Sequence, residues 1–338
     1  MKAFVVTGPG QGAVSDVPDP RAGPGEVVVD VEQVGLCGTD VELFSGEMAY
    51  LQDGHAWYPI RPGHEWCGTV NAVGLGVDAG WLGLRVTADT MLGCTTCRLC
   101  RTGRQHVCRD RQEIGVRGGR PGALAWQLAV PARALHHLPD RVGPVAGALV
   151  EPGANALRAA LAACEPSVDS VLVCGPGTIG LLTALFLQSM GADVHIAGLS
   201  TASLDFARSL GLEHAWLIDE LPALPFDAVV DCTTSAAMPA RAVEIVEPGG
   251  RVVFIGLSGV PSPVDSRALA FKDAAAVGVL SGSPAIAQTI EAYASGRVDP
   301  TRLVAATVGL DGAADALRGL RSGVGFGAPK IHVRPGLE

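Results

Sequence analysis

Four cysteines stand close together in one short segment of this 338-residue chain: Cys94, Cys97, Cys100 and Cys108. Thiolates at intervals of three, three and eight residues can converge on one zinc ion and fill all four of its tetrahedral positions. Such a closed site stabilises a fold and leaves no position for a substrate. The spacing therefore predicts a structural zinc lobe at about residues 90–110.

Charge and composition around these cysteines favour zinc. Four thiolates give the occupied site a net negative charge, which nearby cations stabilise. Five arginines lie in or beside the segment: Arg98, Arg101, Arg104, Arg109 and Arg111. The alternatives are separate buried cysteines or disulfide bonds. Four of the nine cysteines fall within fifteen residues, which argues against scatter, and the first residues are not typical of a secretion signal, which argues against disulfides.

A second group of metal-type ligands lies upstream of the first. Cys37 begins a Cys-Gly-Thr-Asp segment, and His64 and Glu65 follow a glycine. Taken singly, Cys37 is most simply a small buried hydrophobic residue and His64 a hydrogen-bonded turn histidine. Together, a thiolate, an imidazole and a carboxylate can hold a catalytic zinc that keeps one position open. The combination predicts a metal that binds water or substrate.

A glycine-rich turn follows the apolar run Val171–Val173 and precedes a helical stretch. The first glycine permits a tight turn, the second lets the backbone approach a pyrophosphate, and the third lets helix and strand pack closely. Free amides at the helix N-terminus then bind the phosphates. An ordinary turn is the alternative, but β-α-β alternation on both sides favours a dinucleotide site. The predicted contacts are Gly175, Pro176, Gly177, Thr178, Ile179 and Gly180.

The choice between NAD and NADP depends on the end of the next strand, Asp193–Ala197. NAD sites usually place an acidic residue there for the ribose hydroxyls. Here the corresponding residues are Leu199, Ser200, Thr201 and Ser203. Their hydroxyls can hydrogen-bond a 2′-phosphate, so the sequence favours NADP(H) over NAD(H). Against this, the nearest arginine or lysine is Arg208, and helix N-capping explains the adjacent hydroxyls equally well. Use of both cofactors stays open.

The elements that position these groups fall into two halves. The first 140 or so residues read as short strands between proline and glycine turns: Ala3–Thr7, Val27–Val31, Thr69–Val73 and Leu128–Val130. After Glu151, β-branched runs alternate with helical stretches, which predicts parallel strands joined by crossover helices. The expected strands are Val171–Cys174, Asp193–Ala197, Ala228–Asp231 and Arg251–Ile255, with helices over Thr178–Met190, Thr201–Leu210 and Ala236–Glu247. A helix over Ala285–Ser295 and a strand over Lys330–Val333 follow.

Composition excludes several classes of protein. Hydrophobic residues make up 48% of the chain and charged residues 17%, which is typical of a well-packed enzyme. A net charge of −9 offers no basic surface for nucleic acid. The uncharged stretch Ser170–Ala192 reaches membrane-spanning length, but its Gly-Pro-Gly turn indicates a strand, a turn and a helix. We therefore expect no membrane partner and a cytoplasmic location.

In this order, the two ligand groups and the glycine turn resemble the zinc-dependent medium-chain dehydrogenase/reductase family of alcohol, polyol and threonine dehydrogenases, over essentially the whole chain. The family's zinc signature is matched by Gly63, His64, Glu65, Gly68, Gly74 and Val77. The resemblance implies an α/β chain with a GroES-like β-rich catalytic domain and a Rossmann domain with a doubly wound parallel sheet. We expect the catalytic domain over residues 1–146 and 285–338, and the Rossmann domain over 147–284.

The resemblance also assigns roles around the second ligand group. It implies that Cys37 and His64 are catalytic zinc ligands and that Asp40 orients the ligand histidine. Glu65 and Glu151 match two carboxylates that related polyol and threonine dehydrogenases place at or beside the metal, and the sequence does not decide which one binds. The alternative for Glu151 is an exposed acid before a proline.

The proton path is where the chain departs from the family. Thr39 matches the hydroxyl that relays the substrate proton, but Glu42 stands where many relatives have the next histidine. Glu42 could accept the proton, bind a ribose hydroxyl or be a solvated acid on a helix. The polar segment Ser45–Arg61 should border the substrate and suits a hydroxyl-rich one. A surface loop explains it equally well, and His55 could replace the missing base.

These observations predict a dehydrogenase with two zinc ions per chain, one catalytic and one structural. The expected reaction interconverts a secondary alcohol and a ketone with NAD(P)(H), on a polyol, sugar, cyclitol or amino-alcohol. One alternative is a zinc-containing NADPH reductase of a conjugated carbonyl or an imine. Another, of a different class, is a non-catalytic, zinc-stabilised dinucleotide-binding protein. By resemblance, a homodimer or homotetramer is expected, joined through the Rossmann sheet edge and the structural lobe.

Overall fold

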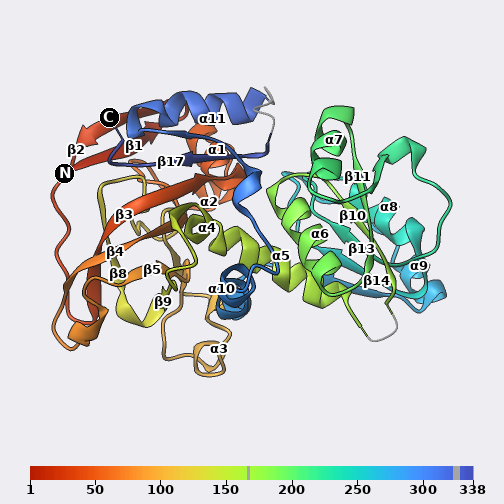
Figure 1. Cartoon of the computed structure of the whole chain (residues 1–338), viewed down its shortest axis with the longest axis horizontal. Helices are drawn as coiled ribbons and strands as arrows, with labels where there is room; N and C mark the ends of the chain where they lie inside the picture. Colours follow the sequence, from red (N-terminus) through yellow and green to blue (C-terminus); the bar gives the residue numbers. More distant parts are fainter. Residues whose placement is uncertain (166–167, 323–327, 338) are drawn as a thin grey trace. The chain divides into compact units, whose positions relative to one another are not determined.

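The computed structural model describes residues 1–165, 168–322 and 328–337. The chain forms two compact units. One comprises Met1–Glu151 together with Ile286–Glu338, and the other comprises Pro152–Ala285 (Figure 1). Both units have their own apolar core, so each is described by itself.

The first unit is built on a seven-stranded sheet with the order β16-β17-β3-β4-β5-β9, in which β8 also pairs with β3. Its central strand β3 is long and rich in valine, which suits a strand whose two faces are largely buried. The strand β17, late in the sequence, pairs antiparallel with β3 and so lies next to an early strand. The strands are β3 (Glu26–Leu36), β4 (Glu65–Val73), β5 (Arg85–Ala88), β8 (Gln127–Pro131), β9 (Leu135–His137), β16 (Val304–Val308) and β17 (Lys330–Val333).

Short elements complete this unit. Two small antiparallel sheets pair β1 (Lys2–Gly8) with β2 (Gln11–Asp16) and β6 (Met91–Leu92) with β7 (Gln112–Glu113). Its helices are α1 (Gly38–Ser45), α2 (Ala49–Gln52), α3 (Arg98–Arg101), α4 (Pro144–Ala148), α10 (Ile286–Ala294) and α11 (Ala313–Ser322). Helix α5 (Val150–Ala163) begins in the first unit and continues in the second.

The second unit is a six-stranded, all-parallel sheet with the order β12-β11-β10-β13-β14-β15. This order reverses between β10 and β13, as in a doubly wound dinucleotide fold. The elements are β10 (Ser170–Cys174), α6 (Thr178–Ser189), β11 (Asp193–Gly198), α7 (Thr201–Ser209), β12 (His214–Leu217), β13 (Phe226–Asp231), α8 (Met238–Ile245), β14 (Val246–Phe254), α9 (Ser266–Lys272) and β15 (Ala275–Gly278). The predicted α/β class is confirmed: the first unit is β-rich, and the second has a doubly wound parallel sheet.

The predicted boundary between α8 and β14 is wrong: the strand expected over Arg251–Ile255 spans Val246–Phe254. The helix expected over Ala236–Glu247 spans only Met238–Ile245, and Val246 already begins β14. The physical reason is Pro248, because the residue before a proline is pushed out of the helical region. The uncharged stretch around the glycine turn divides into β10 and α6, as predicted. In the described part of the chain, no helix combines the length and the apolar character needed to cross a membrane.

Candidate active site

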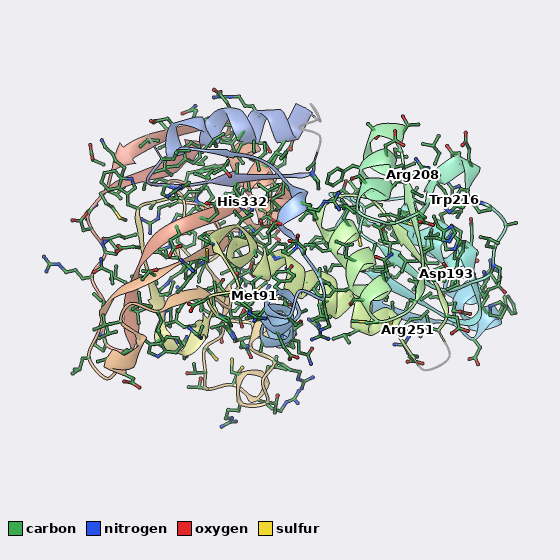
Figure 2. The ribbon with its side chains drawn as sticks, viewed as in Figure 1. Met91, Asp193, Arg208, Trp216, Arg251 and His332 are labelled. Atoms are coloured by element: carbon green, nitrogen blue, oxygen red, sulfur yellow. The ribbon has the colours of Figure 1, made fainter. Side chains whose placement is uncertain are left out.

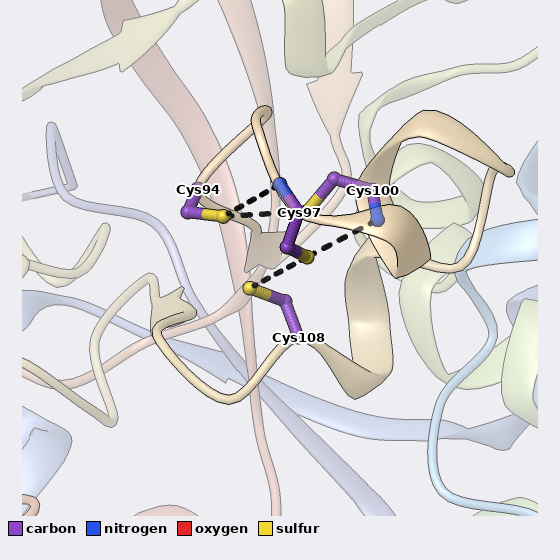
Figure 3. Close-up of side chains that lie close together, drawn as sticks. All are labelled: Cys94, Cys97, Cys100 and Cys108. Atoms are coloured by element: carbon purple, nitrogen blue, oxygen red, sulfur yellow. Dashed lines mark hydrogen bonds between the residues drawn. The ribbon is translucent and has the colours of Figure 1, made fainter.

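The four lobe cysteines point toward one another from a single loop and α3 (Figure 3). Their sulfur atoms all lie within 4.8 Å of one another. The Sγ atoms of Cys94 and Cys100 are 4.0 Å apart, and those of Cys97 and Cys108 are 3.8 Å apart. Zinc–sulfur bonds of about 2.3 Å in a tetrahedron separate neighbouring sulfurs by about 3.8 Å. The lobe therefore has the dimensions that a four-thiolate zinc requires.

The electrostatics of the lobe also fit a bound cation. The amides of Cys97 and Cys100 donate to the sulfur atoms of Cys94 and Cys97, at 3.4 and 3.5 Å. Hydrogen bonds from Thr96 and from backbone amides lower the pKa of Cys94 to about 6. Burial and the neighbouring thiols raise the pKa of Cys100 to about 12. Four adjacent thiols cannot all ionise without a cation between them. None of the nine cysteines, all within the described ranges, forms a disulfide.

The second ligand group forms where β3 meets α1 and where β4 begins. Cys37 is the N-cap residue of α1, and Glu65 is the first residue of β4. Cys37 Sγ lies 3.1 Å from His64 Nε2. One ligand atom from each of Cys37, His64 and Glu65 lies within 4.8 Å of the other two. This set of a sulfur, a nitrogen and an oxygen fits a catalytic zinc, which uses such mixed ligands.

Asp40 holds this group together from the first turn of α1. Its carboxylate is fully buried and accepts hydrogen bonds from the amides of Cys37 (3.0 Å) and Gly63 (3.1 Å). Its Oδ1 atom also lies 3.5 Å from His64 Nδ1. Asp40 therefore occupies the position from which a carboxylate can orient the imidazole and leave Nε2 directed toward Cys37.

The pKa values show that these groups share charge. Burial alone would raise the pKa of Asp40, but His64 and the two amides lower it below its ordinary value. Burial alone would lower the pKa of His64, but Cys37 and Asp40 raise it well above its ordinary value. For Cys37, burial raises the pKa of the thiol and His64 only partly opposes this. The sulfur and the imidazole nitrogen, 3.1 Å apart, thus lie where a divalent cation would stabilise the thiolate.

The carboxylate of Glu65 reaches past the neighbouring strand β3 and contacts Lys330, a lysine that the sequence analysis did not single out. Lys330 Nζ, on β17, donates to Glu65 Oε2 at 2.7 Å, to Oε1 at 2.9 Å and to the carbonyl oxygen of Leu36 at 2.9 Å. The strand between them, β3, carries Gly35 at the crossing, where an added Cβ would overlap Glu65 Oε2. The usable signal was this glycine inside a valine-rich strand, which often marks a close approach.

The remaining candidates lie on α1 and α5. Glu151, in the first turn of α5, is half-buried and is not one of the three residues whose ligand atoms cluster. Thr39 is half-buried in the first turn of α1. Glu42 is half-buried one turn further along α1, and burial, assisted by the charge of Glu47, raises the pKa of its carboxyl. A raised pKa suits a carboxylate that exchanges protons near neutral pH.

In the second unit, the glycine turn lines a cavity of about 750 Å³. Helix α6 begins after Gly177 with no side chain capping its first amides, which are therefore free to bind phosphate. Gly180 packs against the carbonyl oxygen of Gly175, where a Cβ would overlap it. Pro176 also lines the cavity, and Thr178 and Ile179 form the first turn of α6. The turn is built for close approach of a backbone to a ligand.

The residues after β11 reach the same cavity. Leu199 is 88% exposed, and Ser200 is the N-cap of α7, accepting from the amide of Ser203 at 3.3 Å. The hydroxyls of Ser200 and Ser203 lie 2.9 Å apart, and Thr201 is exposed. The capping role weighed as the alternative is thus present. Leu199, Ser200 and Ser203 line the cavity beside the glycine turn.

Arg208, the nearest cation in sequence, is directed elsewhere: it pairs with Asp205 at 2.7 Å and donates to the carbonyl oxygen of Ala215. The cavity instead contains Arg241, from α8. Its guanidinium donates to the carbonyl oxygen of Ile218 and pairs with Asp219 at 3.1 Å. The sequence analysis missed Arg241 because it lies far from β11 along the chain.

A third group of metal-type side chains lies at the β11–β12 edge, where Asp193 and Trp216 are labelled in Figure 2. His195 Nε2 is 3.4 Å from Asp193, and His214 stacks on His195 at 4.6 Å. The indole N–H of Trp216, which can only donate, lies 3.1 Å from His195 Nδ1. The neutral His195 therefore carries its proton on Nε2, toward Asp193. A metal at Nε2 would require the other tautomer, so we interpret this group as a hydrogen-bonded network.

Comparisons with known proteins agree with both units. Residues 23–140 match the family described as alcohol dehydrogenase GroES-like domain, and residues 178–295 match the family described as zinc-binding dehydrogenase. An L-threonine 3-dehydrogenase from Mesorhizobium japonicum is 30% identical over 338 positions, covering 96% of each chain.

Two solved structures extend this likeness over the full fold. One, from Escherichia coli CFT073, is described as a short chain alcohol dehydrogenase and contains NADH; it is 25% identical, covers 99% of both chains and has a TM-score of 0.91. The other, from Sinorhizobium meliloti 1021, contains NADP; it is 26% identical, covers 99% of both chains and has a TM-score of 0.89.

Proposed function

The chain belongs to the zinc-dependent medium-chain dehydrogenase family, and we propose that it interconverts a polar secondary alcohol and its ketone with NADP(H). It is an alcohol dehydrogenase of the zinc-type, NAD(P)-dependent class, as its relatives are. The observation that carries the proposal is the clustering of Cys37, His64 and Glu65 around a buried Asp40. We assign the catalytic role to the unit of Met1–Glu151 and Ile286–Glu338, and cofactor binding to the unit of Pro152–Ala285.

Two zinc ions per chain are part of this proposal. Cys37 and His64 would hold the catalytic ion, with Glu65 or Glu151 as the carboxylate beside it, and the four lobe cysteines would hold the structural one. The catalytic ion supplies Lewis acidity toward the substrate oxygen. Lys330 keeps both oxygens of Glu65 engaged, which supports Glu151 as the carboxylate that binds the metal.

In this proposal, side chains of α1 carry away the proton of the alcohol. Thr39 receives it by hydrogen bonding, and Glu42 accepts it one turn further along the helix. The raised pKa of Glu42 supports this role, because a carboxyl with an ordinary pKa is a weaker base near neutral pH. His55 is exposed in the segment Ser45–Arg61 and belongs to the loop that we assign to the substrate.

The cofactor preference is assigned to two features of the cavity. The exposed hydroxyl-bearing turn at Ser200 offers no carboxylate that would repel a 2′-phosphate, and Arg241 adds a cation to the same cavity. Arg241→Gln should weaken NADPH binding by about tenfold, because a charge-assisted contact contributes roughly 1.5–3 kcal/mol. NADH binding should change less than threefold, and fluorescence titration of both reduced cofactors measures the difference. Equal loss for both cofactors would contradict the assignment.

We also propose a homodimer or homotetramer. Strand β15 ends the parallel sheet, and Ala275, Ala276 and Gly278 on it are exposed. An apolar edge strand with free backbone groups readily pairs with another strand. A second copy of the chain, adding its own β15, would continue the sheet across a two-fold axis.

The deciding experiment combines zinc analysis with turnover. Wild-type protein should contain two zinc ions per chain, and Cys37→Ala should contain one and lose turnover. NADPH and NADH oxidation should be followed with ketoses, cyclitol ketones, amino-ketones and simple ketones. One zinc ion in the wild type, unchanged in Cys37→Ala, would contradict the proposal and favour a reductase that uses no catalytic zinc or a non-catalytic dinucleotide-binding protein.

A further inference from the structure

Arg111 connects three parts of the first unit. It follows the last lobe cysteine by three residues, and its side chain is only 11% exposed. The guanidinium donates from Nε to Glu113 Oε1 at 2.8 Å, from Nη1 to the carbonyl oxygen of Cys108 at 3.2 Å, and from Nη2 to the hydroxyl of Tyr50 at 3.0 Å. The Tyr50 hydroxyl in turn donates to Glu113 Oε1 at 3.2 Å. Arg111 therefore joins the cysteine lobe, β7 and α2.

The loop that contains α2, residues 46–57, is held by the polar contacts of this tyrosine, by packing of Ala56 in the apolar core, and by the carbonyl oxygen of His55, which accepts from the amide of Gly118 at 2.9 Å. Helix α2 has four residues and none of them is buried. The carbonyl oxygen of Tyr50 accepts from the amides of His55 and Ala56, both at 2.8 Å. Arg117 lies over the Tyr50 ring, 5.3 Å from its centroid, and the ring of His55 meets its edge at 5.9 Å. The turn around α2, which has no buried residue of its own, therefore depends in part on these polar contacts for its order.

The same segment also reaches the strand that carries a proposed zinc ligand. The amide of Ile114 donates to the carbonyl oxygen of Thr90 at 3.1 Å, and the Thr90 hydroxyl donates to the carbonyl oxygen of His64 at 3.4 Å. Residues 111–118 thus contact the lobe and loop 46–57 directly, and are connected to the backbone of His64 through Thr90. A displacement of this segment would reach the loop and the His64 backbone together.

We propose that Arg111 is a positioning residue through which the filled cysteine lobe orders loop 46–57 and sets the affinity for substrate. The geometry gives Arg111 this role because one guanidinium bonds both the carbonyl oxygen of Cys108, the last cysteine of the lobe, and the hydroxyl of Tyr50. The effect on affinity rests on the proposed function, in which the loop contacts substrate. The structural link between lobe and loop does not.

The test compares three variants of the full-length, zinc-loaded protein. Arg111→Met keeps the side-chain length and removes the donors, Tyr50→Phe removes one hydroxyl, and Arg101→Met removes an exposed arginine from the same lobe. In Arg111→Met, amide hydrogen exchange in residues 46–57 should accelerate about tenfold, because charge-assisted hydrogen bonds are lost there. Zinc content should stay at the wild-type level. KM should rise about fivefold to tenfold, and kcat should stay within about twofold.

Two comparisons make the outcome decisive. Tyr50→Phe should accelerate the same amides less than Arg111→Met, and Arg101→Met should match the wild type. Cys97→Ser, which opens the lobe, should accelerate loop exchange in the wild-type background and add little to Arg111→Met, because both changes break one connection. Three outcomes would each overturn the proposal. The effects of Cys97→Ser and Arg111→Met on loop exchange could be additive, loop exchange could be unchanged in Arg111→Met, or exchange could accelerate equally throughout the first unit. Hydrogen exchange decides it even if no alcohol proves to be a substrate.

Discussion

The two zinc-type groups of the first unit are built in opposite ways. The cysteine lobe takes its four ligands from fifteen consecutive residues and is partly exposed. The group at Cys37 and His64 is assembled from the ends of two strands and is surrounded by buried charge. It depends on Asp40 within α1, on Gly35 in β3 and on Lys330 in β17. A closed site can be specified by one loop, whereas a reactive site needs its charges balanced by residues far away in the sequence.

Removing one ligand from each group gives the largest contrast. His64→Ala should lower kcat/KM by about 10³-fold or more, because several kcal/mol of metal assistance disappear. Cys108→Ser should lose the lobe zinc but keep turnover within about tenfold for chains that remain folded. Zinc analysis and steady-state kinetics on the monodisperse fraction measure both. Similar losses of kcat/KM in the two variants would break the distinction between a catalytic and a structural group.

The buried ion pair across β3 should matter for stability. Lys330→Met leaves the Glu65 carboxylate buried without its partner, so the free energy of unfolding should fall by about 3–5 kcal/mol. Adding Glu65→Gln should recover part of this loss, because the uncompensated charge is removed. Lys2→Met is the matched control: Lys2 pairs with Asp16 on the surface and should have no measurable effect. Urea unfolding measures all four proteins, and equal effects at Lys2 and Lys330 would contradict the role of burial.

The role of Glu42 should be visible in the pH dependence of alcohol oxidation. A protonated carboxyl cannot accept the alcohol proton, so oxidation should weaken as pH falls through the raised pKa of Glu42. Glu42→Gln should lower kcat by about 10²-fold and remove this fall in activity at low pH, which we call the acidic limb of the pH profile. Glu47→Gln should instead move the limb to lower pH, because it removes the nearby negative charge that assists in raising the pKa. A limb that persists unchanged in Glu42→Gln would exclude Glu42 as the acceptor.

The smallest expected effect concerns the attachment of the lobe. Gln105 donates from Nε2 to Asp89 at 2.9 Å and ties the lobe to the body of the unit. Gln105→Ala should lower the free energy of unfolding by about 1 kcal/mol, the usual contribution of one hydrogen bond. Zinc content should not change, because all four sulfur ligands belong to the lobe itself. Loss of zinc in this variant would show that the lobe is not self-contained.

The cysteine lobe and the group at Cys37 and His64 also differ in how much of them could be predicted from the sequence. The lobe, the glycine turn and the alternation of strands and helices were predictable because each is a local pattern. Lys330 was not, because its partner Glu65 is 265 positions earlier and only the pairing of β17 with β3 brings them together. Arg241 was missed for the same reason, since it lines the same cavity as Leu199 and Ser200 only in the folded chain. Local propensity also placed the end of α8 too late, where Pro248 prevents the helix from continuing.

The pairing of β17 with β3 has a consequence for the order of synthesis. Residues 152–285 are translated before β16 and β17, so the second unit can fold while the first still lacks two strands of its sheet. Until Lys330 leaves the ribosome, the carboxylate of Glu65 has no buried cation and is best left in water. The ligand group at Cys37 and His64 can therefore close only late in synthesis, after the nucleotide-binding sheet is already formed. The lobe, whose cysteines are all translated early, could take up its zinc long before.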